Sequence, residues 1–356
     1  MASPDALPQE LRRVIDANLN RSGEGLRILE EMARLVLGDV MLSQRLKTLR
    51  HGLLSRNPTF NKELIEARNA ESDAGIGILA PGQEEKDLST LVVASARRVQ
   101  ESLHTVEEIV KLKGITPQLD PEKLKKARLQ LYSLERELLS RLLRQDKAER
   151  ISGLHAIIDT QALRGRSHIE VAREIIRGGA KTVQLRDKLT NKRELVSIAQ
   201  QLKALCAEHN VLFIVNDYLD LALAADADGL HLGQEDLPIK IARRLLPIDK
   251  ILGCSTHSPE QAKAAESDGA DYIAIGSIYP TPSKETAVIA GLDGLRQVRE
   301  TVSLPVVAIG GITEGNVAEV IAAGASSVAV ISAILSTESP EAATRQIVAR
   351  IEMQHG

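Results

Sequence analysis

Residues 306–332 read VVAIGGITEGNVAEVIAAGASSVAVIS. Two short runs rich in β-branched residues, Val306–Ile309 and Val328–Ser332, flank a helix-compatible segment at Thr313–Ala323. A strand, a helix and a second strand in this order form a crossover unit, so the two strands run parallel in one sheet. The stretch therefore predicts a parallel sheet covered by helices.

The same alternation extends over the whole chain from about residue 150. Eight β-branched runs are visible: Leu154–Asp159, Thr182–Arg186, Leu212–Asp217, Gly229–Leu232, Ile251–Ser255, Tyr272–Ser277, Val306–Ile309 and Val328–Ser332. Eight repeats within roughly 200 residues match the lower size range of a closed (β/α)8 barrel. An open doubly wound sheet is the alternative, but the Gly-x-Gly-x-x-Gly fingerprint does not follow the first run. We therefore expect an α/β protein with a TIM barrel over residues 151–356.

Residues 1–150 have a different pattern, rich in Leu, Arg and Glu. Apolar residues recur at three- and four-residue steps across Leu11–Leu37, which predicts an amphipathic helix. Gly23 and Gly25 weaken its middle, so we expect a kink or a close helix crossing there. Further helices are predicted at Met41–Arg56, Asp87–Leu112 and Pro121–Asp146 (with Asp120 as N-cap), and a loop at Asn69–Glu85. This part is predicted to be an all-α helical domain.

The composition excludes several classes of function. Aromatic residues make up 2% of the chain and the net charge is -3, which disfavours nucleic-acid binding by stacking or by a basic field. Two cysteines, Cys206 and Cys254, are too few for a disulfide framework or a Cys-based zinc site. We see no signal peptide and no apolar stretch of about 18 residues. We therefore expect a cytoplasmic protein with small-molecule substrates and no membrane partner.

Polar residues at the ends of the predicted strands are the first candidates for a site, because barrel chemistry lies at the C-terminal ends of the strands. Alternation along the second strand places Gln184 inward and Arg186 and Lys188 at the rim. Two cations two residues apart can bind a diphosphate, with Arg as a bidentate donor and Lys as a point charge. The alternative is a solvated ion pair with Asp187.

Two acidic residues follow the next two strands. Asn216 and Asp217 end the third strand, and Asp236 follows the fourth. Neighbouring strands bring the two carboxylates to one rim, where they suit Mg²⁺ together with phosphate oxygens and water. A helix N-cap is the alternative role for Asp236.

Hydroxyl groups and glycines follow the later strands. Ser255 ends the fifth strand, and a proline-stiffened loop after the sixth holds two hydroxyls and Lys284. Gly310-Gly311 and Ile331-Ser332 each open a predicted helix, and backbone N–H groups at such turns bind phosphate. One phosphate cup, one cationic pair and one carboxylate pair predict two phosphorylated substrates and a divalent metal.

From about Gly153 to Ile351 the chain resembles the thiamine-phosphate synthase family, which joins a pyrimidine to a thiazole. The resemblance rests on six motifs in order: Gln184–Lys188, Val215–Asp217, His231–Leu237, Thr281–Lys284, Ile309–Ile312 and Ile331-Ser332. Any one of them is weak, but six in order are specific. Ser283 stands where the family usually has Thr, and Tyr218 replaces an Arg that often follows Asn-Asp.

The resemblance implies a role for each motif. It implies contacts to the pyrimidine diphosphate from Gln184, Leu185, Arg186, Asp187, Lys188, Asn216, Ser255 and Lys284. It implies contacts to the thiazole phosphate from Thr281, Pro282, Ser283, Gly311, Ile331 and Ser332. It further implies Asp217 and Asp236 as ligands of one Mg²⁺, and Arg186, Lys188, Lys284 and Ser255 as catalytic residues.

The implied reaction joins 4-amino-2-methyl-5-(diphosphooxymethyl)pyrimidine to a 4-methyl-5-(2-phosphoethyl)thiazole, or to its 2-carboxy form. Thiamine phosphate and diphosphate are the products, and the diphosphate leaves first. Such a step needs charge neutralisation and no enzyme nucleophile. The alternative is a barrel like the related thiazole tautomerase, or a metabolite-sensing module. The tautomerase has a His where this chain has Ser277, which cannot act as a general acid or base.

The helical domain resembles the N-terminal extension of long, cyanobacterial forms of this synthase, through Arg13–Arg21 and Glu24–Arg27. The resemblance implies no activity for it. Asp16, Asn20, Glu24 and Arg27 lie at four- and three-residue steps. Such a stripe is a ligand site if it is buried and an i,i+4 charge ladder if it is exposed. Two roles are open for this domain. One is packing or homo-oligomer formation, and the other is regulatory binding of a metabolite or partner. A pocket lined by Arg27, Arg34 or Arg50 would favour regulatory binding.

Overall fold

A computed structural model describes residues 7–54, 58–68, 87–112, 119–281 and 289–354 of the chain. The contacts divide the chain into two compact units, Met1–Leu143 and Arg144–Gly356. The predicted loop at 69–85, and the predicted site residues Pro282, Ser283 and Lys284, lie outside the described residues. None of the helices within the described ranges combines the length and apolar character needed to cross a membrane.

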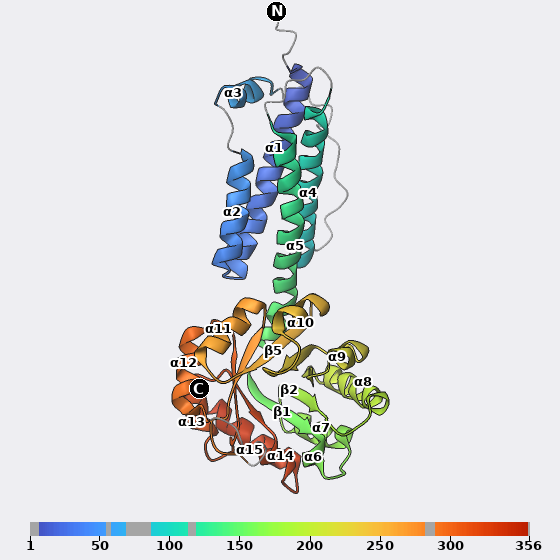
Figure 1. The fold of residues 1–356 in the computed structure, drawn as a ribbon, viewed down its shortest axis with the longest axis vertical. Coiled ribbons are helices and arrows are strands. Elements are labelled where there is room, and N and C mark those ends of the chain that lie inside the picture. Colours follow the sequence, from blue (N-terminus) through green and yellow to red (C-terminus); the bar gives the residue numbers. More distant parts are fainter. Residues whose placement is uncertain (1–6, 55–57, 69–86, 113–118, 282–288, 355–356) are drawn as a thin grey trace, which may run out of the picture. The chain divides into compact units, whose positions relative to one another are not determined.

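The first unit is a bundle of long helices, as predicted (Figure 1). Its elements are α1 (Gln9–Glu31), the π-helical η1 (Met32–Val36), α2 (Val40–Leu54), α3 (Pro58–Glu66), α4 (Leu88–Val110) and the part of α5 (Pro121–Glu149) up to Leu143. Their apolar faces form one core that includes Leu19, Leu46 and Leu103. The short helix α3 was not predicted, because nine residues with two buried apolar side chains leave little periodic signal.

The glycines of α1 mark a close helix crossing and do not interrupt the helix. A Cβ atom on Gly25 would lie 2.5 Å from Val99 Cγ2 and 3.0 Å from the Ser95 carbonyl oxygen, both on α4. Only a residue without a side chain lets the two backbones approach this closely. Of the two alternatives drawn from the sequence, the close crossing is therefore confirmed.

The second unit is a closed barrel of eight parallel strands, paired in sequence order with β8 returning to β1. The strands are β1 (Gly153–Asp159), β2 (Thr182–Arg186), β3 (Leu212–Asn216), β4 (Gly229–Leu232), β5 (Ile251–Thr256), β6 (Tyr272–Ile275), β7 (Val306–Ile309) and β8 (Ser327–Val330). The surrounding helices are α6 (Thr160–Leu163), α7 (His168–Arg177), α8 (Lys192–Glu208), α9 (Leu219–Ala224), α10 (Ile239–Leu245), α11 (Pro259–Asp268), α12 (Gly291–Thr301), α13 (Val317–Ala322), α14 (Ser332–Leu335) and α15 (Pro340–Glu352). The predicted TIM barrel is confirmed.

Alternation along the strands gives the barrel two separate apolar layers. Ile157, Ile214 and Val307 belong to a small cluster in the interior of the barrel. Leu185 and Phe213 belong to the large cluster between the strands and the outer helices. Because each layer takes every second residue, a polar residue in phase with Ile157 points into the barrel.

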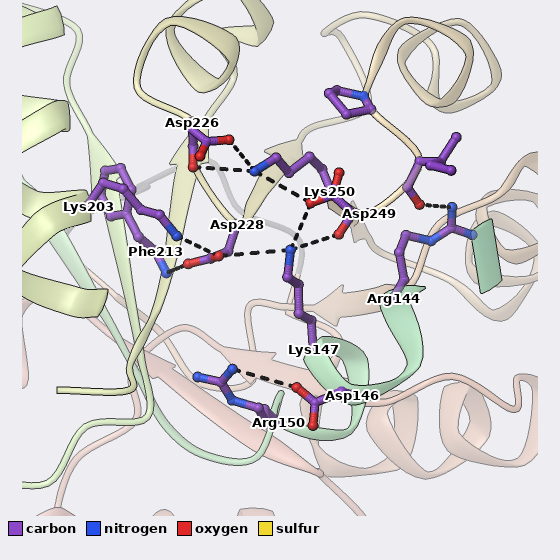
Figure 2. Close-up of polar contacts among 12 residues, drawn as sticks. Arg144, Asp146, Lys147, Arg150, Lys203, Phe213, Asp226, Asp228, Asp249 and Lys250 are labelled. Atoms are coloured by element: carbon purple, nitrogen blue, oxygen red, sulfur yellow. Dashed lines mark hydrogen bonds and ion pairs between the residues drawn. The ribbon is translucent and has the colours of Figure 1, made fainter. Parts of the chain in front are cut away.

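The N-terminal ends of the strands are held by a network of ion pairs (Figure 2). Residues 144–149 of α5 belong to this unit, and Arg144 Nε lies 2.8 Å from Asp271 Oδ1. Asp271 Oδ2 also accepts hydrogen bonds from Arg243 Nη1 (3.0 Å) and the Leu252 amide (2.8 Å). Lys147 lies 3.2 Å from Asp249 Oδ2. This end of the barrel is thus used for stability, which leaves the other end for chemistry.

Candidate active site

Two carboxylates face each other where β3 and β4 end. Asp217 follows β3, and Asp236 lies in the loop after β4. The pKa of Asp217 is raised to about 6, first because the carboxyl is partly buried and second because Asp236 shares a hydrogen bond and repels its charge. Asp236 Oδ2 accepts a hydrogen bond from the Gly233 amide at 2.7 Å. It does not cap α10, whose N-cap is Pro238, so the alternative role considered for it is wrong.

The backbone of Asp217 is in the left-handed region, with φ +62°. Its amide donates to the His231 carbonyl (2.8 Å), and the next amide, of Tyr218, donates to Asn216 (2.7 Å). Aspartate and asparagine tolerate this conformation better than other residues with a side chain. The predicted third strand therefore ends one residue early, at Asn216, and the tight turn holds the Asp217 carboxyl at the mouth.

The two cations at the end of β2 each have an acidic partner from another strand. Arg186 forms an ion pair with Asp159, which ends β1 directly opposite it in the sheet register. Lys188 Nζ lies 3.6 Å from Asp217 Oδ2, and the lysine side chain is 53% exposed. Both cations lower the pKa of Asp217, against the stronger effects of burial and of Asp236. Each of the two cations is thus paired with a carboxylate from a neighbouring strand.

Asp187 stands between these cations in sequence but does not pair with either. Its Oδ1 accepts from the amides of Leu189 and Thr190, both at 2.8 Å, and its Oδ2 accepts from the Thr160 hydroxyl at 2.5 Å. Burial raises its pKa, but these hydrogen bonds outweigh burial and the pKa is lowered. Asp187 therefore shapes the loop that carries Lys188, and the ion pair considered from the sequence is wrong.

Gln184 points into the barrel, in register with Ile157 and Ile214. Its side-chain amide lies 3.1 Å from His155 Nε2, and both residues are buried. Leu185 faces the opposite way, into the outer core. Neither the Leu185 nor the Asp187 side chain is brought to the mouth, and the substrate contacts expected of these two residues stay a prediction.

Ser255, near the end of β5, is hydrogen-bonded to a buried histidine. Its Oγ lies 2.9 Å from His231 Nε2, and His231 Nδ1 lies 3.0 Å from the Tyr272 hydroxyl. Burial lowers the pKa of His231 to about 4, although Asp236 opposes this, and burial raises the pKa of Tyr272 far above its usual value. Both rings are therefore neutral at neutral pH.

The loops after β6, β7 and β8 form the other side of the mouth. Gly310 and Gly311 have φ values of +101° and +66°. A Cβ on Gly310 would lie 2.0 Å from Ser277 Oγ, and one on Gly311 would lie 2.6 Å from the Pro280 carbonyl oxygen. These glycines let the β7 loop pack against the β6 loop, which leads to Thr281. The next helix, α13, begins at Val317 and not directly after Gly311, where it was predicted, because a turn at residues 313–316 comes first.

After β8, the chain passes directly into a helix. Ile331 is the N-cap of α14, and Ser332 is its first residue. The predicted strand to Ser332 therefore stops at Val330, and the helix opening predicted here is confirmed. This helix start and the glycine turn after β7 both follow the C-terminal ends of parallel strands, so they lie at the same end of the barrel.

Sequence reasoning assigned no role to Asp159, His231 or Tyr272. Asp159 carried the same signal as Asp217, an acid that ends a strand. His231 and Tyr272 are polar side chains within strands, in phase with the inward-facing residues. Their phase in the strands was a usable signal, because a buried polar side chain needs a partner.

A closed parallel barrel with cations, carboxylates and glycine turns at the C-terminal ends of its strands defines a phosphate-binding barrel enzyme. Residues 154–334 match the thiamine monophosphate synthase family, and residues 13–137 match the ThiD2 family. The chain belongs to the thiamine monophosphate synthase family.

Similar proteins extend over both units. The chain is 38% identical to a thiamine-phosphate synthase of Thermosynechococcus vestitus, over 98% of this chain and 97% of the relative. It is 39% identical to one of Synechocystis, over 97% of this chain and 98% of the relative. A solved thiamine phosphate pyrophosphorylase of Pyrococcus furiosus matches with a TM-score of 0.54 and 40% identity, over 58% of this chain and 99% of that one.

The polar stripe of α1 in the helical unit is divided between two environments. Asp16 is buried and binds Arg68 through two hydrogen bonds of 2.7 and 3.1 Å. Asn20 Nδ2 donates to Asp16 at 3.2 Å, whereas Glu24 is exposed and Arg27 pairs with Glu31 one turn on. The stripe is therefore mainly an i,i+4 ladder, anchored at one end by an ion pair between the buried Asp16 and the half-exposed Arg68.

Arg50, one of the three arginines considered for a pocket, pairs with Glu30 at 2.9 Å, and Arg34 is exposed. The role of the helical unit stays a prediction with both alternatives open.

Proposed function

We propose that the barrel joins a pyrimidine diphosphate to a thiazole phosphate, releasing diphosphate and forming thiamine phosphate. The observation that carries the proposal is the set of charged groups and turns at the C-terminal ends of the barrel strands, in a chain that belongs to this family. Two cations and two carboxylates lie at the ends of β2, β3 and β4, and the glycine turn and the helix start follow β7 and β8. One side suits a diphosphate and the other suits a phosphate monoester.

The diphosphate is assigned to the side of Arg186 and Lys188. The Arg186 guanidinium presents a fixed fork of donors, and Asp159 holds it in place from β1. The exposed Lys188 ammonium leaves its 3.6 Å contact with Asp217 to meet the incoming anion. Asn216 and Ser255 add neutral donors, and Lys284 is assigned to the same substrate from outside the described residues. These groups bind the diphosphate more strongly as charge builds up on its departure.

The carboxylate pair fits one Mg²⁺. Burial first, and then the hydrogen bond and the charge of Asp236, raise the pKa of Asp217 to about 6, and a bound cation would remove the repulsion between the two carboxylates. No cluster of three or more His, Cys, Asp or Glu residues suited to a metal occurs among the described residues, so the remaining ligands would be diphosphate oxygens and water. Mg²⁺ is commonly bound in this way. A magnesium ion held by Asp217 and Asp236 would supply charge neutralisation for the leaving diphosphate.

The remaining residues orient the reacting groups. Gln184, fixed by His155 inside the barrel, faces the pyrimidine. Gly311, Ile331 and Ser332 hold the thiazole phosphate with backbone N–H groups, helped by Thr281 and, outside the described residues, by Pro282 and Ser283. The diphosphate leaves first and takes the bonding electron pair with it, and the thiazole nitrogen then attacks the cationic methylene carbon, so a positioned nucleophile on the enzyme is unnecessary.

The test is diphosphate release by the full chain given both substrates, with Mg²⁺ and then with EDTA. We expect release only when both substrates and the metal are present. Arg186→Gln is expected to lower the rate at least about 100-fold, because it removes a charge-assisted bidentate contact. Arg173→Gln, at an exposed position on α7, is the matched control and keeps the full rate.

Release that continues in EDTA would overturn the metal role. No release by folded protein would overturn the synthase assignment and favour the tautomerase-like or ligand-sensing alternative.

A further inference from the structure

Tyr272 is a large polar side chain enclosed in the barrel, at the start of β6. It is fully buried, and its ring fills the space beside Gly253 on β5. A Cβ on Gly253 would lie 2.0 Å from Tyr272 Cζ. The ring is thus held in a slot that a glycine keeps open. Among the described residues, its hydroxyl is hydrogen-bonded to His231 Nδ1 alone, at 3.0 Å.

The contact continues to the mouth of the barrel. The His231 and Tyr272 rings are stacked, with centroids 5.5 Å apart and planes at 27°. The other ring nitrogen of His231, Nε2, lies 2.9 Å from Ser255 Oγ. The row begins at Tyr272, the first residue of β6, passes through His231 on β4 and ends at Ser255, near the end of β5. The three hydrogen-bonded side chains therefore extend through the barrel interior from the start of one strand to the end of another.

The hydrogen-bond direction in this row follows from counting protons. A neutral imidazole has one N–H and one lone pair. If Nδ1 carried the proton, it would donate to the Tyr272 oxygen, and the buried tyrosine O–H would have no acceptor among the described residues. If Tyr272 donates to Nδ1, every buried donor is used: Nε2 carries the proton and donates to Ser255 Oγ. Buried donors without an acceptor are strongly disfavoured, so the second arrangement prevails.

We propose that Tyr272 is a positioning residue that acts through His231 to keep Ser255 as a hydrogen-bond donor toward the substrate. Since the Ser255 oxygen already accepts from His231, its own O–H is free to point into the mouth. An anionic oxygen of the diphosphate accepts a hydrogen bond from this O–H group, whereas a serine that donated to His231 would present only lone pairs to the anion. This inference rests on the proposed function for the identity of the anion, but the tautomer of His231 does not depend on it.

The first test reads the tautomer directly in the full chain without substrate. Nitrogen NMR of protein labelled with ¹⁵N-histidine separates protonated from unprotonated ring nitrogens, and His231→Gln assigns the signal among the eight histidines. We expect a protonated Nε2 and an unprotonated Nδ1 in His231. A protonated Nδ1 would overturn the proposal whatever reaction the enzyme catalyses.

The second test is a double-mutant cycle on single-turnover diphosphate release. Tyr272→Phe keeps the ring in its slot and removes only the hydroxyl. We expect it to lower the rate about tenfold, the effect of one hydrogen bond of ordinary strength. In a Ser255→Ala background it is expected to change nothing, because the residue through which it acts is gone.

An equal loss in both backgrounds would show that Tyr272 acts on stability or packing alone. Tyr132→Phe removes a hydroxyl from an exposed tyrosine of α5 and serves as the matched control.

Discussion

Replacing Asp217 by Asn is expected to make the metal-free barrel more stable while it abolishes turnover. The folded protein raises the pKa of this carboxyl from 3.8 to about 6. At about 1.4 kcal/mol per pKa unit, the shift corresponds to about 3 kcal/mol for a fully shielded group. The side chain is 16% exposed and faces the mouth, so screening by water reduces this to about 1–2 kcal/mol. Asparagine tolerates the left-handed backbone, so the exchange adds little strain.

The sign follows from proton binding. A carboxyl whose pKa is higher in the folded state than in the unfolded state binds protons more tightly when folded, so it destabilises the fold at pH above 6. This destabilisation shrinks as pH falls from about 6 toward 4, and it vanishes when both states are protonated. The advantage of Asp217→Asn is therefore expected to be full at pH 7.5 and absent below pH 4.

Scanning calorimetry in EDTA measures the effect. For a barrel of this size, about 1–2 kcal/mol raises the melting temperature of the barrel transition by about 3–6 °C at pH 7.5. With Mg²⁺ and pyrimidine diphosphate added, the original protein is expected to melt above the Asp217→Asn variant, because only the original protein gains stability from bound ligands. Asp220→Asn, at an acid on α9, is the control and is not expected to stabilise. A variant that melts below the original protein in EDTA at pH 7.5 would refute the reasoning, since the contact with Lys188 would then outweigh repulsion by Asp236.

Three further predictions concern the phosphate cup and the opposite end of the barrel. Gly311→Ala is expected to raise the KM for the thiazole phosphate at least about tenfold, because a Cβ would lie 2.6 Å from the Pro280 carbonyl oxygen. The control, Gly165→Ala, also places a Cβ on a residue with positive φ but meets no atom within 4 Å, and it is expected to leave the KM unchanged. Asp271→Ala is expected to destabilise the barrel by about 3 kcal/mol in calorimetry, because two arginines and an amide lose their acceptor. The control, Asp249→Ala, removes a more exposed carboxylate and is expected to change the free energy of unfolding by less than about 1 kcal/mol. A fragment 144–356 is expected to release diphosphate and to melt above the fragment 151–356, because only the longer one keeps Arg144 for Asp271; equal melting temperatures would contradict a role for this contact.

The barrel was predictable because its strands are short apolar runs that repeat eight times. Strand ends were less predictable, since they depend on single backbone angles. The third strand stops before Asp217 because that residue has φ +62°. The helix expected directly after Gly311 begins at Val317, because residues 313–316 form a turn in which Asn316 Oδ1 accepts from the Thr313 amide at 2.8 Å. A hydrophobic pattern carries no information on such angles.

In the site, sequence reasoning located groups but not their partners. The strand-end rule placed Arg186, Lys188, Asp217 and Asp236 at the mouth, where the structure has them. It could not show that Asp187 turns inward to Thr160, because alternation ends with the strand and the loop follows its own hydrogen bonds. The row that begins at Tyr272 was missed because its three members lie on different strands and become neighbours only when the barrel closes.

Closure of the barrel also has a consequence for synthesis on the ribosome. The first strand pairs with the last, and Ser327 Oγ donates to the Gly153 carbonyl oxygen (3.0 Å) across that seam. During translation the edge of β1 that pairs with β8 therefore stays unpaired until more than 170 further residues have emerged from the ribosome. An exposed strand edge invites pairing with other chains. We therefore expect truncated chains that end before β8 to aggregate and to depend on chaperones, even though they contain most of the residues assigned to the site.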